Sequence, residues 1–262
     1  MTGAAAARVR SPKSDRETLI DMNPSGLRLD LHNHTTYSSD GVMTPAELLR
    51  AARKNGLACI AVTDHNTVKG ALEALALAGA DPTSPRVIPG VEVSTADGHV
   101  IALYVQEDIP KGLPALESIA LIKERGGLVY LPHPYDILRR GAVASHVREQ
   151  VAREADIVEV LNGRSLSRWS VNNSYALARR HSKSEGAGSD AHGRTEVGRA
   201  YVEVERYPSR EDLVTLVAAG RLRDGLHWHE YALNWALQPL AVFTRFRRKR
   251  VRRLLRSCLQ RR

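Results

Sequence analysis

Histidine and carboxylate side chains recur in this 262-residue sequence directly after short apolar runs. His32 and His34 are two residues apart in an extended segment, so both rings point to one face and can share a cation. Asp190 and His192 repeat this spacing near the other end of the chain. One such pair alone is better explained by loop histidines that bond to the backbone, but two pairs at strand ends favour a metal site.

Three more candidate ligands, His65, Glu92 and His133, also follow or lie within apolar runs. Imidazole nitrogen and carboxylate oxygen without cysteine suit Zn, Mn or Fe(II) better than Ca or an all-oxygen Mg site. Asp64, next to His65, is either a ligand or a residue that orients a ligand histidine through its second ring nitrogen. We favour the orienting role.

The elements that must position these residues alternate in type along the chain. Aliphatic runs predict strands at residues 28–32, 59–63, 87–93, 100–105, 128–131, 157–161 and 186–189. Amphipathic stretches predict helices at residues 44–55, 68–78, 114–125, 145–154, 170–180 and 209–219. Thr44 is the predicted N-cap of the first helix, with Pro45 in its first turn. Seven strands with helical crossovers predict a mainly parallel β/α barrel, whose C-terminal rim would collect the candidate ligands.

The length and composition indicate one catalytic domain with two flanking segments. A chain of this length with 43% hydrophobic residues can bury one sizeable core. We predict a flexible leader at residues 1–26, the barrel at 27–224 and a basic amphipathic tail at 225–262. Two distant cysteines, and the lack of an apolar run long enough for a signal peptide or a membrane span, predict a cytoplasmic protein without a transmembrane segment.

The net charge of +9 comes from the tail and not from the predicted barrel. Residues 245–262 hold ten basic residues and no acidic one. Apolar residues fall among them at helical spacing: Val251, Leu254, Leu255, Cys258 and Leu259. Such a helix could lie on an anionic membrane surface, bind nucleic acid or an acidic partner, or pack on the barrel with its arginines in solvent. Peripheral membrane association therefore stays open beside the cytoplasmic location.

The motifs together resemble one known family, the PHP (polymerase and histidinol phosphatase) superfamily of metal-dependent phosphoesterases. The resemblance rests on His32-x-His34, Ser39-Asp40-Gly41, Thr63-Asp64-His65, Gly90-x-Glu92, His133-Pro134 and Ser189-Asp190-Ala191-His192, in the family's order. The segment with Glu159, Asn162 and Gly163 resembles the compact branch that carries a PHP-associated C-terminal region. The resemblance implies an α/β fold, a distorted (β/α)7 TIM-like barrel, here followed by the basic helical tail.

The resemblance also implies two to three divalent ions, Mn, Zn or Fe, bound by nine residues. One ion would be held by His32, His34, Glu92 and Asp190. A second would be held by Glu92, His99 and His133, and a third by Asp40, His65 and His192. Glu92 would therefore bridge two ions. The assignment of His99 rests on its place just before the predicted strand at 100–105.

One branch of the family, the nucleoside-bisphosphate phosphatases and RNA-trimming enzymes, usually has a large insert before the residue that matches His133. Here His99 and His133 are only 34 residues apart. A lid or substrate-selecting insert is therefore missing, and the substrate of that branch does not carry over directly.

The predicted activity is hydrolysis of a phosphomonoester or phosphodiester in a phosphorylated small molecule or nucleotide. The predicted catalytic residues are Glu92, His65 and Asp64, and the predicted nucleophile is a hydroxide that bridges two metal ions. Amide, carbamate or ester hydrolysis at the same metals is an alternative. A nucleic-acid or membrane-surface binding module that acts through the basic tail is another.

Three basic residues are the predicted phosphate-binding groups: Lys69, Arg164 and Arg194. Each follows a predicted rim strand, where a guanidinium can form a fork to phosphate. Solvated surface charges would give the same sequence pattern.

Overall fold

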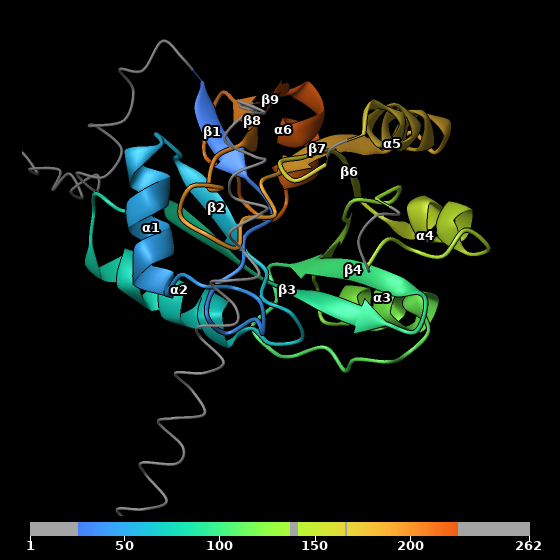
Figure 1. Cartoon of the computed structure of the whole chain (residues 1–262), viewed down its shortest axis with the longest axis horizontal. Coiled ribbons are helices and arrows are strands. Elements are labelled where there is room, and N and C mark those ends of the chain that lie inside the picture. Colours follow the sequence, from blue (N-terminus) through green and yellow to red (C-terminus); the bar gives the residue numbers. More distant parts are fainter. Residues whose placement is uncertain (1–25, 137–140, 166, 225–262) are drawn as a thin grey trace, which may run out of the picture.

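The computed structural model describes residues 26–136, 141–165 and 167–224, so most of the predicted leader and all of the predicted tail lie outside the described residues. The strands are β1 (Leu27–Asp30), β2 (Cys59–Val62), β3 (Arg86–Thr95), β4 (Gly98–Leu103), β5 (Leu128–Leu131), β6 (Ile157–Asn162), β7 (Ser184–Gly188), β8 (Ala200–Val204) and β9 (Arg221–Asp224). The helices are α1 (Pro45–Lys54), α2 (Lys69–Ala80), α3 (Ala115–Glu124), α4 (Arg148–Glu154), α5 (Arg168–Arg180) and α6 (Leu213–Ala219). The helices lie around the outside of the sheet (Figure 1).

The strands form one sheet in the order β7-β6-β5-β4-β3-β2-β1-β8-β9, which curves into a nearly closed barrel. The chain just after β1 closes the barrel against the end of β7. There, Leu31 N donates to Ala187 O at 3.3 Å and His34 N donates to Ala191 O at 2.8 Å. The predicted α/β barrel is therefore confirmed.

The prediction of a mainly parallel sheet is only half right. The pairs β1–β2, β2–β3, β5–β6 and β6–β7 are parallel, whereas β3–β4, β4–β5, β1–β8 and β8–β9 are antiparallel. Neither β8 nor β9 is predicted from the sequence. In β8, buried and partly exposed residues alternate, a signal that the sequence does contain, but β9 has a single apolar residue among Arg and Asp.

The antiparallel direction of β4 matters for the site. Because β3 and β4 form a hairpin, Ser94 pairs with His99 and Thr95 with Gly98. The first residues of β4 therefore lie beside the C-terminal end of β3. A side chain at the start of β4 can reach the rim that the neighbouring strands reach with their ends.

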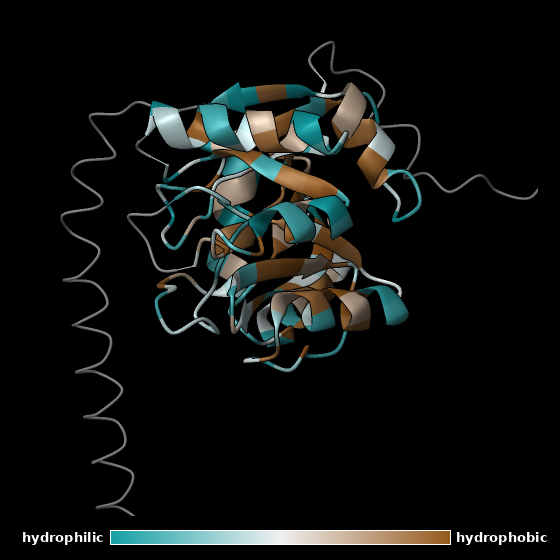
Figure 2. Cartoon of the chain, turned by 90° about the vertical axis from the view of Figure 1, so that its right-hand side faces the viewer, coloured by the Kyte–Doolittle hydropathy of each residue, from teal (hydrophilic) through white to brown (hydrophobic). Residues whose placement is uncertain are grey.

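Helix α1 shows how local sequence sets an element boundary. The Thr44 hydroxyl accepts from Glu47 N, the Glu47 carboxylate accepts from Thr44 N, and Pro45 occupies the first turn, as predicted. Leu48 and Ala52 on its inner face are buried in a cluster with residues of β2 and α2. Most strands are brown and helices mix brown with teal in Figure 2, as expected when one helix face is buried. Among the described residues, the helices are too short or too polar to cross a membrane.

Candidate metal centre

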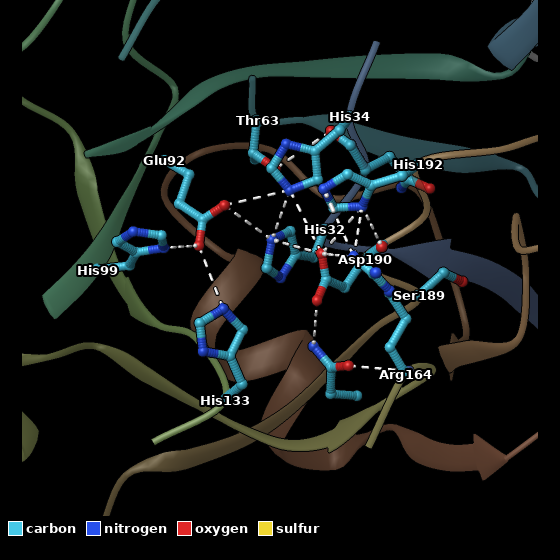
Figure 3. Close-up of polar contacts among 12 residues, drawn as sticks. His32, His34, Thr63, Glu92, His99, His133, Arg164, Ser189, Asp190 and His192 are labelled. Atoms are coloured by element: carbon cyan, nitrogen blue, oxygen red, sulfur yellow. Dashed lines mark hydrogen bonds and ion pairs between the residues drawn. The ribbon is translucent and has the colours of Figure 1, made fainter. Parts of the chain in front are cut away.

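The histidines and carboxylates predicted as metal ligands lie together at one rim of the barrel (Figure 3). Most of them follow a strand: His32 and His34 after β1, His65 after β2, His133 after β5, and Asp190 and His192 after β7. Glu92 is inside β3, His99 is the second residue of β4, and Asp40 lies in the loop before α1. The closure of the sheet thus brings together residues from both ends of the described chain.

Glu92 is the centre of the cluster, with a side chain that is only 1% exposed. Its Oε2 atom lies 3.1 Å from His34 Nε2 and 3.3 Å from His32 Nε2. Its Oε1 atom lies 2.8 Å from His99 Nδ1 and 3.2 Å from His133 Nε2. The two oxygens therefore face two separate groups of imidazoles, as a carboxylate that bridges two cations would.

Asp190 adds a second carboxylate to the first of these groups. Its Oδ1 atom lies 3.4 Å from His34 Nε2 and 3.6 Å from His32 Nε2. The two ring nitrogens are themselves only 3.0 Å apart. His32, His34 and Asp190 thus present three ligand atoms to one point, and Glu92 presents a fourth.

Asp40 joins the remaining two histidines at the exposed side of the cluster. Its Oδ2 atom lies 3.1 Å from His192 Nε2 and 3.6 Å from His65 Nε2. The other ring nitrogen of His65 lies 3.2 Å from Glu92 Oε2. This third group is therefore joined to the other two through the contact between His65 and Glu92.

Within the described ranges, four sets of three side chains can each place one ligand atom within 4.8 Å of the others. They are His32–His34–Asp190, His32–Glu92–His133, His65–Glu92–His99 and His34–His65–His192. Two buried atoms of the cluster, Asp40 Oδ1 and His65 Nδ1, make no hydrogen bond to any described residue. Cations would satisfy both atoms, and a nitrogen and oxygen donor set without thiolate fits the predicted Zn, Mn or Fe(II).

The charges of the cluster depend on one another. Burial by itself would raise the pKa of Glu92, but the positive charge of His65 and His99 holds it well below its ordinary value. Burial likewise opposes protonation of His34, but contacts with Asp190 and Glu92 raise its pKa to about 9. The carboxylates of Glu92, Asp190 and Asp40 are therefore ionised, and without a cation His34 balances part of their charge by holding a proton, whereas burial lowers the pKa of His192.

Two of the candidate ligands have left-handed backbone conformations that are uncommon for residues other than glycine. His133 has a φ of 29° and Asp190 has a φ of 51°. Backbone strain of this kind persists where surrounding contacts hold it, and it often marks functional sites. Here Asp190 N donates to His32 O at 2.7 Å and His133 N donates to Glu159 Oε2 at 2.7 Å.

Among the described residues, the Asp64 carboxylate forms its hydrogen bonds with Thr35 and Ser38 and not with a histidine ring. Its carboxylate accepts from the backbone N of Thr35 at 2.7 Å and from the Thr35 hydroxyl at 2.6 Å. It also accepts from Ser38 N at 3.0 Å and from the Ser38 hydroxyl at 2.8 Å. The Ser38 hydroxyl in turn lies 3.1 Å from His34 Nδ1. Asp64 can therefore orient His34 only through Ser38. The Asp64 side chain is fully buried, which gives no support to a direct catalytic role.

The three predicted phosphate-binding residues lie in different surroundings. The Arg164 side chain, 12% exposed, points into the cluster, with one guanidinium nitrogen 2.9 Å from His192 Nδ1 and 3.8 Å from Asp190 Oδ1 (Figure 3). The Arg194 side chain is 69% exposed and lies 3.6 Å from Glu47 on α1. Lys69 is exposed at the first residue of α2. The structure thus brings only Arg164 to the candidate ligands.

The sequence reasoning missed Glu159 and Asn162 as site residues. Glu159 Oε1 lies 3.1 Å from His32 Nδ1, and Asn162 Nδ2 donates to Glu159 Oε2 at 2.9 Å. A signal was present, because Glu159 interrupts the aliphatic segment that forms β6 and Asn162 ends it. A buried charge in a central strand needs partners, and here the partners are parts of the candidate metal centre.

Comparisons with known proteins agree with this geometry. Residues 30–155 match the PHP domain model and residues 170–222 match the model of the PHP-associated region. An uncharacterized protein of Methanocaldococcus jannaschii is 41% identical over 119 residues, which cover 42% of this chain and 68% of that protein. A second uncharacterized protein of the same organism is 32% identical over 180 residues, which cover 68% of this chain and 70% of that protein.

Other relatives carry the names of enzymes, and two of them bear on the chemistry of this site. A 5'-3' exoribonuclease of Haemophilus influenzae is 31% identical over 138 residues, 48% of this chain and 49% of that enzyme. A 3',5'-nucleoside bisphosphate phosphatase of Chromobacterium violaceum is 37% identical over 98 residues, 35% of this chain and 32% of that enzyme.

A solved structure shares the fold. It is a two-domain protein from Bacteroides vulgatus that contains a predicted PHP-like metal-dependent phosphoesterase, with a TM-score of 0.64 and 15% identity. The match covers 85% of this chain and 70% of that one. Together with the two family models and the rim cluster around Glu92, these similarities show that the chain belongs to the PHP family of metal-dependent phosphoesterases.

Proposed function

We propose that the chain hydrolyses a phosphomonoester or phosphodiester at the rim cluster, with two to three divalent ions of Mn, Zn or Fe. The observation that carries this proposal is Glu92, a buried carboxylate with each oxygen in contact with a different group of imidazoles. The residues that would hold the ions are His32, His34, Asp40, His65, Glu92, His99, His133, Asp190 and His192. Bound cations would supply the activation of water and the neutralisation of charge on the phosphoryl oxygens.

The substrate would approach from the exposed side of the cluster. The side chains of His32 and His34 are fully buried, whereas that of His65 is 20% exposed and that of Asp40 is 43% exposed. His65 therefore stands where the leaving oxygen can meet solvent, and in our proposal a water beside His65 protonates that oxygen. Glu92 stays ionised and keeps the surrounding imidazoles in place.

Arg164 would bind the phosphoryl group. Its guanidinium lies beside Asp190 and His192, so its charge is at the cluster and largely shielded from water. A guanidinium in such a place can donate two parallel hydrogen bonds to phosphate oxygens. This placement favours phosphate esters over the uncharged amide or ester substrates of the alternative activity.

The substrate class is proposed as a phosphorylated small molecule or a nucleotide. The relatives named as an exoribonuclease and as a nucleoside bisphosphate phosphatase support a nucleotide, although each alignment covers less than half of the enzyme. The short distance in sequence between His99 and His133 means that this chain recognises its substrate without an insert at that place.

The test combines metal content with hydrolysis. We expect elemental analysis of the purified full chain to find two to three ions, and added Mn to support hydrolysis of p-nitrophenyl phosphate or its bis-ester. Glu92→Gln should lose metal and turnover together, because one bridging carboxylate oxygen becomes an amide. Glu117→Gln, an exposed change on α3, is the matched control. Full turnover by a metal-free Glu92→Gln protein would overturn the proposal.

A further inference from the structure

An irregularity in β6 places two polar side chains on the same side of the strand. Glu159 pairs with Gly186, but Leu161 pairs with the next residue of β7, Ala187, so β6 contains one extra residue at this point. In a regular strand, residues 159 and 162 would point to opposite faces. The bulge instead allows Asn162 Nδ2 to donate to Glu159 Oε2 at 2.9 Å.

The Glu159 carboxylate is buried and has partners at both oxygens. Oε1 accepts from the Tyr130 hydroxyl at 3.0 Å and lies 3.1 Å from His32 Nδ1. Oε2 accepts from His133 N at 2.7 Å and from Asn162. A carboxylate can accept at both of its oxygens, so this side chain can serve all four of these groups.

The first consequence concerns the tautomer of His32. When Glu159 accepts the proton on Nδ1, the lone pair of His32 stays on Nε2. That nitrogen lies 3.3 Å from Glu92 Oε2 and 3.0 Å from His34 Nε2, at the point where the first cation would bind. Gly188 leaves the space for this contact, because a Cβ there would lie 2.4 Å from His32 Cβ and 2.8 Å from Glu159 Oε1.

The second consequence concerns His133, whose backbone has a φ of 29°. The hydrogen bond from its backbone N to Glu159 Oε2 holds this conformation, and the ring nitrogen Nε2 then lies 3.2 Å from Glu92 Oε1. His133 belongs to a different candidate ion position from that of His34 and Asp190. One carboxylate therefore acts on ligands of two positions.

Asn162 connects Glu159 with two further residues of the site, Asp190 and Arg164. Its Nδ2 atom also lies 3.4 Å from Asp190 Oδ2, and its Oδ1 atom accepts from Arg164 N at 2.9 Å. The same side chain thus connects Glu159 with a candidate ligand and with the loop that carries the candidate phosphate-binding arginine.

We propose that Glu159 and Asn162 form a bracket that positions the ligands of two metal positions at once, so that both positions lose affinity together when Glu159 is changed. The proposal rests on the proposed metal-dependent function. Glu159 would act only through His32 and His133, as a positioning residue.

The test is Zn(II) binding to the metal-free full chain, measured by competition with a chromogenic chelator and compared between Glu159→Gln and Tyr130→Phe. Glu159→Gln replaces a carboxylate that accepts at both oxygens by a neutral amide, which weakens the contacts with His32 and with His133 N together, and its NH2 group then faces donors at one of the two places. Tyr130→Phe is the matched control, because it removes a hydrogen bond to the same buried carboxylate and leaves the hydrogen bonds from His32 and His133 to Glu159 in place.

We expect Glu159→Gln to weaken at least two Zn(II) binding steps by about 10- to 100-fold, the usual effect of removing the partner of a ligand histidine. Tyr130→Phe should stay within about threefold of the unchanged chain, because one neutral hydrogen bond has a modest net effect. If Glu159→Gln binds Zn(II) like Tyr130→Phe, the carboxylate only stabilises the fold and the proposal is wrong. A loss confined to a single binding step would also overturn it.

Asn162→Ala provides a second variant if Glu159→Gln does not fold. It should weaken Zn(II) binding beyond the effect of Tyr130→Phe, and equal affinities of these two variants would overturn the bracket. Zn(II) binding is measured without substrate. A chain that binds Zn(II) as expected but hydrolyses no phosphate ester would therefore contradict the proposed function and leave the bracket intact.

Discussion

The hydroxyl of Ser38 lies 3.1 Å from Nδ1 of His34, and it donates its own proton to Asp64 at 2.8 Å. With that proton committed, the Ser38 oxygen can only accept from His34. When the ring is neutral, as a bound cation requires, the His34 lone pair is then left on Nε2, which faces Glu92 and Asp190. Ser38 thus has the same relation to His34 that Glu159 has to His32.

Replacement of Ser38 by alanine tests this relation. We expect Ser38→Ala to weaken Zn(II) binding by about 10-fold, because His34 is then free to adopt the other tautomer. Chelator competition on the metal-free chain gives the affinity. Ser118→Ala is a suitable control, since Ser118 is a buried serine on α3 whose hydroxyl has no hydrogen-bond partner within the described residues. Equal affinities of the two variants would show that Ser38 does not orient His34.

The two rim arginines should differ in their effect on hydrolysis. Arg164→Ala should raise KM for p-nitrophenyl phosphate by about 10- to 100-fold, because a hydrogen bond between charged groups is lost. Arg194→Ala should change KM by less than about twofold, since its ion pair with Glu47 is largely exposed. If p-nitrophenyl acetate is hydrolysed and Arg164→Ala has no effect on any phosphate ester, the alternative ester or amide activity is favoured.

The raised pKa of His34 predicts a pH dependence with a defined sign. The pKa of His34 is about 9 in the metal-free fold, against an ordinary value of 6.5. The bound proton therefore stabilises the metal-free chain below about pH 6.5, and this stabilisation is lost as the pH rises towards 9. A cation needs the neutral ring, so metal affinity should rise over the same window.

Melting temperatures in the presence and absence of EDTA measure this effect. We expect the melting temperature of the chain in EDTA to fall from pH 6.5 to pH 9, the window set by the shift of His34, while the Zn(II)-loaded chain shows a smaller fall. A metal-free chain whose melting temperature rises through this window would contradict the assignment of the proton to the cluster.

Truncation at residue 244 tests the predicted tail, which lies outside the described residues. Removal of residues 245–262 takes away ten basic residues and should abolish binding to polyanions at low salt. Hydrolysis of p-nitrophenyl phosphate should persist, because the candidate ligands all lie between residues 32 and 192. Sedimentation with anionic vesicles and gel shift with single-stranded RNA distinguish the two kinds of partner. Equal binding by the truncated chain would exclude the tail as the binding element.

His99 shows where prediction from sequence reaches its limit. The resemblance to the PHP family, with its place just before a predicted strand, implied that it is a ligand, and the structure puts its Nδ1 atom 2.8 Å from Glu92 Oε1. The reason is the hairpin that reverses β4, which the expected parallel sheet does not contain. The expectation that ligands follow the C-terminal ends of strands therefore does not account for His99. Its position at the rim follows from the antiparallel pairing of β4 with β3.

The sequence by itself determined which kinds of ligand atoms are present and which of them lie on the same face of an extended segment. Those properties are local, because the two-residue period of an extended chain aligns His32 with His34 and a capping box starts α1 at Pro45. The tertiary structure alone decided which of these atoms meet. Glu159 and His32 are 127 residues apart and touch only because the sheet closes, and Arg164 faces the cluster while Arg194 turns to α1. Contacts of this range depend on barrel closure and on a one-residue bulge in β6, and no local pattern of residues encodes either.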